Sequence, residues 1–184
     1  MSRTRIIPKD QLLVQTASYN TNLQGDSGVP QDLVDWLSPT LRVSRFLAKD
    51  PRAPDVVAVG FQELLPLHLG CELTAAPSHE LLLRLYNLPS VAGLSNGVVE
   101  GRNSLLLSQI EDHAPNKEKY SLVAKTVHVG VALLVYILDE HFARVADVQT
   151  SSTGCGPAYL GNKGAVGVRF RLAGKEGGFG ETLT

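Results

Sequence analysis

Cysteine is scarce in this sequence, and the two that are present form no recognisable pattern. Cys71 and Cys155 make neither a C-x-x-C pair nor a cluster with histidine. This excludes a disulfide scaffold and gives no indication of a structural zinc site, since both need several cysteines at close spacing. We therefore expect a protein of a reducing, cytosolic compartment.

Long hydrophobic runs are also lacking. The longest apolar run extends from Val127 to Leu138, twelve residues, which is too short to cross a bilayer as a helix. The basic start of the chain, Met1 to Lys9, contains Pro8 and is not followed by the apolar segment of a signal peptide. The sequence therefore predicts a protein that is soluble or peripheral on membranes.

There is no excess of charge of either sign. The chain has 17 basic and 18 acidic residues and a net charge of -1. Such a balance predicts neither a nucleic-acid-binding protein nor one drawn strongly to an anionic membrane. We expect no nucleic-acid partner and a cytoplasmic location, with peripheral membrane contact left open.

The sequence does contain enough apolar material for one domain with a sizeable core, at 43% hydrophobic residues. Asp55–Phe61, with three valines and a phenylalanine between turns, is typical of a strand buried on both faces. Strands alternating with helices predict a mixed α/β fold with a sheet-rich core. Further strands are expected at Leu12–Ser18, Val127–Leu138, Phe142–Thr150 and Ala165–Leu172, helices at Glu80–Tyr86 and Ser104–Ile110, and a glycine-rich loop at Ser151–Lys163. Between the two expected helices, Pro89–Asn103 is rich in glycine, serine and asparagine.

Polar residues follow three of the expected strands, where side chains can be held rigidly and remain open to solvent. Glu63 comes directly after the most buried strand, in Phe61-Gln62-Glu63. A lone carboxylate there can hold Mg²⁺, which takes few protein carboxylates and keeps water and phosphate oxygens as its other ligands. On these residues alone, a solvated loop glutamate is the more common explanation of the pattern.

The other two polar segments carry asparagine and lysine. Asn20 and Asn22 lie in a turn, and an asparagine amide can orient a carboxylate or a water without adding charge. Asn162 and Lys163 stand between Gly161 and Gly164, which permit close approach of backbone to a ligand, and a lysine can bind phosphate oxygens. This is no Walker loop, because the spacing and the Ser/Thr are wrong. An ordinary turn and a flexible loop remain the alternatives.

Taken together, the three segments resemble one family. Tyr-Asn-x-Asn at 19–22, F-Q-E-L-L-P-L at 61–67 and G-N-K-G-A-V-G-V-R-F at 161–170 occur in this order, with H-V-G-V-A-L-L-V-Y before the third. The sequence is similar to the inositol polyphosphate 5-phosphatases of the endonuclease/exonuclease/phosphatase superfamily. The resemblance implies a deoxyribonuclease-I-like two-sheet sandwich flanked by helices. It also implies a Mg²⁺ cofactor and, as substrate, a phosphoinositide lipid or a soluble inositol polyphosphate.

The resemblance also assigns residues. It implies that Glu63 binds the metal, that Asn20 lies near metal and nucleophile as a catalytic residue, and that Asn162 and Lys163 face the substrate phosphates. His128 precedes a matching strand, and we interpret it as structural. The resemblance divides the chain into an N-terminal extension, 1–11, and the N-terminal part of a catalytic domain, 12–184, within which 71–101 is atypical or inserted.

The sequence also departs from the family. The Asn/Ala-His-Leu, Gly-Asp-x-Asn and Trp-Cys-Asp-Arg segments, which carry the general base and the catalytic histidine, are absent. The expected fold is therefore incomplete at its C-terminus, and we expect the chain to be inactive alone. Two alternatives stay open: a fragment that only binds, and another phosphodiesterase or nuclease of the same superfamily.

Overall fold

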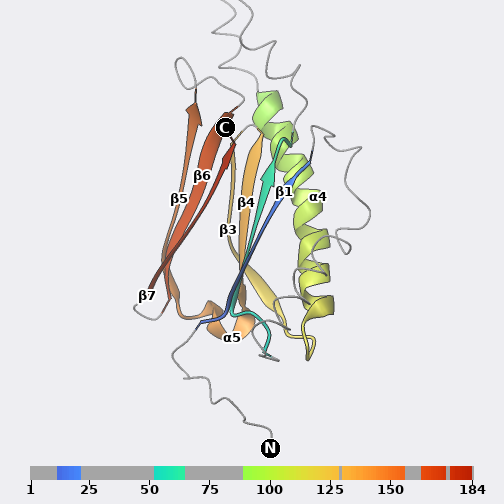
Figure 1. The fold of residues 1–184 in the computed structure, drawn as a ribbon, viewed down its shortest axis with the longest axis vertical. Helices are drawn as coiled ribbons and strands as arrows, with labels where there is room; N and C mark the ends of the chain where they lie inside the picture. Colours follow the sequence, from blue (N-terminus) through green and yellow to red (C-terminus); the bar gives the residue numbers. More distant parts are fainter. Residues whose placement is uncertain are drawn as a thin grey trace, which may run out of the picture.

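The computed structural model describes residues 12–21, 52–64, 89–128, 130–155, 163–172 and 175–183. In this part of the chain two β-sheets face each other, and a long helix covers the outer face of one of them (Figure 1). The described residues contain no helix that is both long and apolar enough to cross a bilayer. The architecture confirms the predicted mixed α/β fold with two sheets.

The first sheet has the strand order β1-β2-β4-β3. β1 is parallel to β2, whereas β4 is antiparallel to both β2 and β3. It follows that β1, β2 and β3 run in the same direction and end at the same edge of the sheet. The strands are β1 (Val14–Asn20), β2 (Val56–Gln62), β3 (Tyr120–His128) and β4 (Val131–Leu138).

The second sheet is antiparallel, with the order β5-β6-β7. Its strands are β5 (Val145–Cys155), β6 (Lys163–Leu172) and β7 (Lys175–Leu183). The register of β5 on β6 shifts between Ala146 and Gln149, which is a β-bulge, and Asp147 there has a positive φ of 53°. Asp147 forms an ion pair of 2.6 Å with Arg171 across this irregularity.

The central strands β2 and β4 are buried on both faces, so their alternate residues enter two separate cores. One core fills the space between the sheets and includes Val56, Leu133 and Phe170. The other lies between the first sheet and the helix and includes Val57, Leu134 and Leu106. This confirms the prediction that the valine-rich run near residue 55 is a strand buried on both faces.

Helix α4 (Pro89–His113) covers the first sheet. The predicted helix, Ser104–Ile110, is shorter than the observed one, because glycines and serines lowered the helical signal between Pro89 and Asn103. Val99, Leu106 and Ile110 are nevertheless spaced so that one helical face is buried against the sheet. Pro89 fits as the first helical residue, where no backbone N–H is needed.

Polar contacts also fix α4 on the sheet. The guanidinium of Arg102, a residue only 1% exposed, lies 5.1 Å from the centre of the Phe61 ring, a cation–π distance. Tyr136 donates a 2.8 Å hydrogen bond to Oδ1 of Asn103. Burial, and to a lesser extent the nearby charge of Glu100, raises the pKa of the Tyr136 hydroxyl far above its ordinary value.

Two other predicted boundaries differ from the structure. The run Val127–Leu138 is not one strand, because the chain reverses between His128 and Val131, which are register partners of β3 and β4. The stretch Phe142–Thr150 begins in the short helix α5 (Asp139–Phe142), and the strand after it continues to Cys155, into the predicted loop. The glycine-containing segment Lys175–Leu183 forms β7, because pairing with β6 outweighs its low β propensity.

Candidate functional site

The described residues of the three predicted polar segments lie around one edge of the sandwich, at the upper end in Figure 1. β1, β2 and β3 end there with Asn20, Gln62 and His128. β6 begins there with Lys163, because the next residue, Gly164, lies against the His128 ring. The structure thus brings the described parts of all three motifs to one end of the molecule.

Asn20 is the last residue of β1, has an exposed side chain and pairs in register with Gln62. The next residue, Thr21, joins the two strand ends. Its backbone N–H donates a 2.9 Å hydrogen bond to the Gln62 carbonyl. Its hydroxyl lies 3.1 Å from the same carbonyl and also within hydrogen-bonding distance of the Glu63 carbonyl. Thr21 therefore fixes the backbone directly before and at Glu63.

Glu63 adopts a conformation that is rare for a residue with a side chain, since its φ is 52°. The residue after it is fixed as well: Leu64 is buried, and its N–H donates a 3.1 Å hydrogen bond to the Gly130 carbonyl. With both neighbours held, the half-buried Glu63 side chain projects from a rigid position. Strained backbone of this kind is often found at functional sites, because the surrounding structure must maintain it.

The loop before β6 is only partly described. Asn22 and Asn162 lie outside the described residues, as does the Lys163 side chain, while the Lys163 backbone pairs with Cys155. The structure therefore locates the start of this loop but not the two side chains predicted to bind phosphate. Gly164 is buried between Thr153 and the ring of His128.

The donors at this edge suit a hard cation with few protein ligands. Among the described residues, no three His, Cys, Asp or Glu side chains group together as a metal cluster. What the edge offers is the Glu63 carboxylate with the Asn20 amide on the neighbouring strand end. Such a set fits Mg²⁺, which retains water and phosphate oxygens, better than Zn²⁺, which needs several nitrogen or sulfur ligands.

The opposite end of the sandwich has a large cleft of about 650 Å³, lined by residues such as Arg52, Asp55 and Glu140. Its buried acid is already bonded: Asp55 accepts a 2.7 Å hydrogen bond from the Leu13 N–H and lies 2.9 Å from Nε2 of His141. Nδ1 of His141 is in turn 3.3 Å from the Arg144 guanidinium. These contacts hold β1, β2 and α5 together, which is a structural role.

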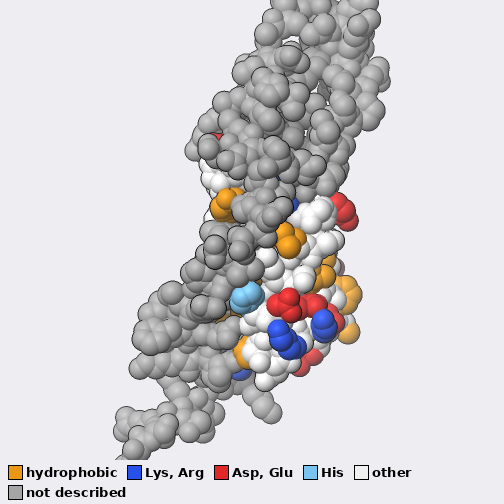
Figure 2. Space-filling model, turned by 90° about the vertical axis from the view of Figure 1, so that its right-hand side faces the viewer, with side chains coloured by type: hydrophobic (Ala, Val, Ile, Leu, Met, Phe, Trp, Pro, Cys, Tyr) orange, Lys and Arg blue, Asp and Glu red, His pale blue; other side chains and the backbone are white. Residues whose placement is uncertain are grey.

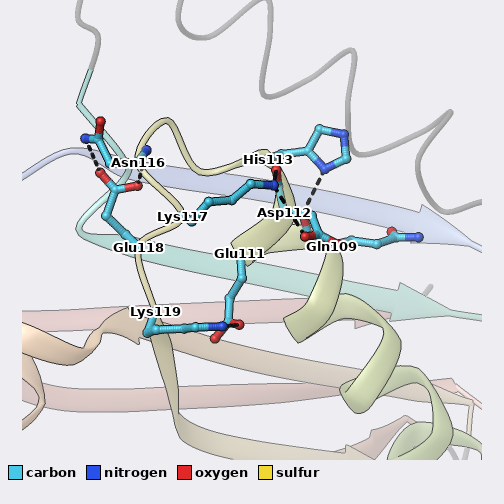
Figure 3. Close-up of polar contacts among 8 residues, drawn as sticks. All are labelled: Gln109, Glu111, Asp112, His113, Asn116, Lys117, Glu118 and Lys119. Atoms are coloured by element: carbon cyan, nitrogen blue, oxygen red, sulfur yellow. Dashed lines mark hydrogen bonds and ion pairs between the residues drawn. The ribbon is translucent and has the colours of Figure 1, made fainter.

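Two ion pairs lie at this end between α4 and the segment that leads into β3 (Figure 3). Lys119 bonds to Glu111, and that hydrogen bond together with the Glu111 charge raises the pKa of the Lys119 amine. Lys117 bonds to Asp112 at 3.4 Å. Figure 2 shows basic and acidic side chains interspersed on this part of the described surface. Because the buried acid and the lysine of this cleft are already held by Leu13, His141 and Glu111, the cleft is a poorer candidate site than the upper edge.

Sequence reasoning missed the residues that support Glu63. Thr21 lies inside the Tyr-Asn-x-Asn segment, but its role depends on the parallel pairing of β1 with β2, which no local pattern reveals. Arg102 lies in the helix that was predicted to start later. Only the Gly164 position carried a sequence signal, as the glycine that follows Lys163.

Comparison with solved structures identifies the class of fold. The inositol polyphosphate 5-phosphatase domain of SPsynaptojanin, solved with inositol (1,4)-bisphosphate and calcium, matches 93% of this chain and 39% of that chain, with a TM-score of 0.56 and 22% identity. This likeness confirms the predicted deoxyribonuclease-I-like sandwich. A Cimex nitrophorin in a ferrous NO complex matches 96% of this chain and 48% of that one, with a TM-score of 0.54 and 20% identity. The fold alone therefore does not decide the chemistry.

Comparison with protein families then gives the assignment. The model of endonuclease/exonuclease/phosphatase family 2 matches residues 17–180, and the chain belongs to this family. Human synaptojanin-1 is 31% identical over 145 residues, which is 76% of this chain and 8% of that protein. The type I inositol polyphosphate 5-phosphatase 8 of Arabidopsis thaliana is 31% identical over 157 residues, which is 77% of this chain and 30% of that protein. The resemblance to the 5-phosphatases is confirmed, although the chain spans less than a third of either relative.

Proposed function

We propose that this chain provides the metal-binding part of the active site of an inositol polyphosphate 5-phosphatase. The observation that carries the proposal is the strained Glu63, fixed by Thr21 and by Gly130 at the edge where β6 begins with Lys163. A carboxylate held rigidly beside a lysine-bearing loop can place a cation and a phosphate group together. The names of the relatives support the substrate class.

Each residue has a role in this proposal. Glu63 holds a divalent cation, for which we propose Mg²⁺, and this cation when bound neutralises charge on the phosphate oxygens. Asn20, exposed at the neighbouring strand end, orients the attacking water or the carboxylate through its amide. Asn162 and Lys163 bind the phosphate, and the lysine charge stabilises the negative charge that develops on it.

The substrate is an inositol ring with a phosphate at position 5, carried by a phosphoinositide lipid or by a soluble inositol polyphosphate. The type II inositol 1,4,5-trisphosphate 5-phosphatase of Mus musculus is 30% identical over 140 residues, which is 76% of this chain and 12% of that protein, and its name supports this substrate class. We propose a cytoplasmic protein with peripheral membrane contact and no nucleic-acid partner, in keeping with the net charge of -1.

The 184 residues should bind metal weakly and turn over substrate at a negligible rate. The family segments that supply the base and the histidine have no counterpart in the sequence. Catalytic groups that act as one unit are not additive, so part of a site does not give a proportional part of the rate.

The test compares this chain with a chimera in which the downstream part of the Arabidopsis 5-phosphatase domain follows Leu183. Phosphate release from inositol 1,4,5-trisphosphate and from phosphoinositide vesicles is measured with Mg²⁺. We expect turnover by the chimera only, and its loss on Glu63→Gln. Equal turnover by both proteins, or full activity of the Glu63→Gln chimera, would overturn the proposal. Cleavage of plasmid DNA in place of the inositol phosphates would favour the nuclease alternative.

A further inference from the structure

The two sheets contribute different parts of the candidate site. Asn20 and Glu63 follow strands of the first sheet, whereas Lys163 begins a strand of the second. One contact between the sheets at this edge is made by the ring of His128, the last residue of β3, against Gly164, the second residue of β6. This contact lies between the strand ends that carry Asn20 and Glu63 and the strand that begins with Lys163.

The ring of His128 occupies the space that a side chain at position 164 would need. A Cβ on Gly164 would lie 2.6 Å from Cδ2 and 3.2 Å from Nε2 of His128, and 2.5 Å from the Thr153 carbonyl oxygen. The first and last of these distances are closer than van der Waals contact allows. Histidine and glycine therefore fit each other, and the start of β6 lies directly on the imidazole.

Packing alone does not explain why this residue is polar. Nε2 of His128 is buried and makes no hydrogen bond within the part of the chain that the structure describes. A buried polar atom in this state lowers stability, and an aromatic hydrocarbon ring could fill the same space without that penalty. The presence of a histidine here is explained if Nε2 forms a hydrogen bond when a ligand occupies the site.

A short path of contacts connects His128 with Glu63. Leu64, the residue after Glu63, donates its 3.1 Å hydrogen bond to the Gly130 carbonyl. Gly130 belongs to the reversal that joins β3 to β4, directly after His128. The imidazole thus touches the strand that begins with Lys163 on one side and is two residues from the anchor of the Glu63 backbone on the other.

We propose that His128 is a positioning residue of this site. Its ring sets the distance between Glu63 and the first residues of β6, and its Nε2 becomes hydrogen-bonded when a phosphate ester binds at the edge. This rests on the proposed function and deepens it, because it assigns to a residue outside the three motifs the task of holding the cation and phosphate parts in register.

The test uses the 5-phosphatase chimera with three substitutions, His128→Ala, His128→Phe and His128→Gln. His113→Ala at the far end of α4 is the matched control. The probe is inositol (1,4)-bisphosphate with Mg²⁺, its affinity is measured by calorimetry, and the His128 ring nitrogens are observed by ¹⁵N NMR. We expect about tenfold weaker binding for His128→Ala, in the range seen for residues that orient ligands of a metal site. The control should bind like the wild type.

The Phe and Gln variants separate packing from hydrogen bonding. His128→Phe should restore stability but bind the probe as weakly as His128→Ala, whereas His128→Gln, which keeps an N–H donor, should recover most of the affinity. The wild-type Nε2 resonance should shift when the probe is added. Recovery of affinity by Phe, or an unchanged affinity in the Ala variant, overturns the proposal.

A second measurement distinguishes this proposal from the proposed function. If the wild-type chimera binds no probe, the proposed function fails, and His128 is then judged by hydrogen exchange of the Lys163 and Gly164 amides without ligand. Faster exchange in His128→Ala than in His113→Ala supports the positioning of β6 by the ring. Equal exchange in the two variants overturns it.

Discussion

The two ends of the first sheet differ in whether their polar side chains have hydrogen-bond or ion-pair partners among the described residues. At the lower end, Asp55, His141 and Arg144 form a closed chain of contacts, and Lys119 is paired with Glu111. At the upper end, Glu63 has a positive φ and His128 buries a ring nitrogen that has no hydrogen bond among the described residues. The large cleft lies at the lower, satisfied end. Backbone strain and a ring nitrogen without a hydrogen bond among the described residues, rather than cleft volume, therefore distinguish the upper end as the candidate site.

The largest effect is expected at the lower end. Asp55→Ala removes the acceptor of the Leu13 N–H and of His141, in a side chain that is only 12% exposed. We expect a loss of roughly 3 kcal/mol in the free energy of unfolding, because buried polar partners are left without a carboxylate. Urea denaturation measures it. Asp112→Ala, at a side chain that is 68% exposed, is the control and should change stability by less than about 0.5 kcal/mol.

The next largest effect tests how closely Gly164 packs against His128 and Thr153 at the upper end. Gly164→Ala should destabilise the protein by about 2 kcal/mol, since the new methyl group meets a backbone carbonyl and the His128 ring. Gly101→Ala is the matched substitution, in the interior of α4 with nothing within 4 Å of the added Cβ. It should stabilise by about 0.5–1 kcal/mol through helix propensity. The same sign for both variants in thermal denaturation would contradict this description of Gly164.

Glu63 gives the sharpest contrast between stability and function. Glu63→Gly should raise stability by about 1 kcal/mol, because glycine adopts a positive φ without strain, yet abolish binding of Mg²⁺ at this edge. Lys117 has a φ of 59° at the lower end. Lys117→Gly should therefore give a similar gain with no change in metal affinity. Loss of metal binding in both variants would show that relief of strain, not the carboxylate, is responsible.

The smallest effect concerns the contact of α4 with β4. The folded protein holds the Tyr136 proton at pH values where an unfolded tyrosine, with a pKa near 10, has lost it, since burial raises its pKa. The native state then binds more protons than the unfolded state, so stability falls as pH rises above about 10. Tyr136→Phe should lose about 1 kcal/mol at neutral pH, through the Asn103 hydrogen bond, and show a flatter decline in alkaline urea titrations.

Strands that are buried along their whole length could be predicted from the sequence. Elements whose form depends on packing or pairing with distant segments could not. Val56–Gln62 could be recognised because every position is apolar or small up to its polar end. Residues 89–103 could not, because their glycines hide a helical face that only the sheet reveals. β7 likewise depends on β6 for its form.

The sequence motifs predicted where the candidate site lies, but not the contacts that hold its residues in place. Asn20 and Glu63 stand in recognisable segments at strand ends, so their position could be predicted from local sequence. Their roles remain proposals. The contacts of Thr21 with Gln62 and of His128 with Gly164 could not be predicted, because each joins residues far apart in the chain and depends on sheet register.

The hydrogen bonds of Thr21 couple ligand binding at Glu63 to the docking of β1 on β2. The Thr21 hydroxyl lies within hydrogen-bonding distance of the Gln62 and Glu63 carbonyls, and Thr21 precedes these two residues by 41 and 42 positions in the chain. Transient detachment of β1 would release Glu63 while β2 keeps its pairing with β4. A ligand bound through Glu63 therefore favours the docked state by mass action, and the protein should report occupancy as slower amide exchange along Val14–Asn20.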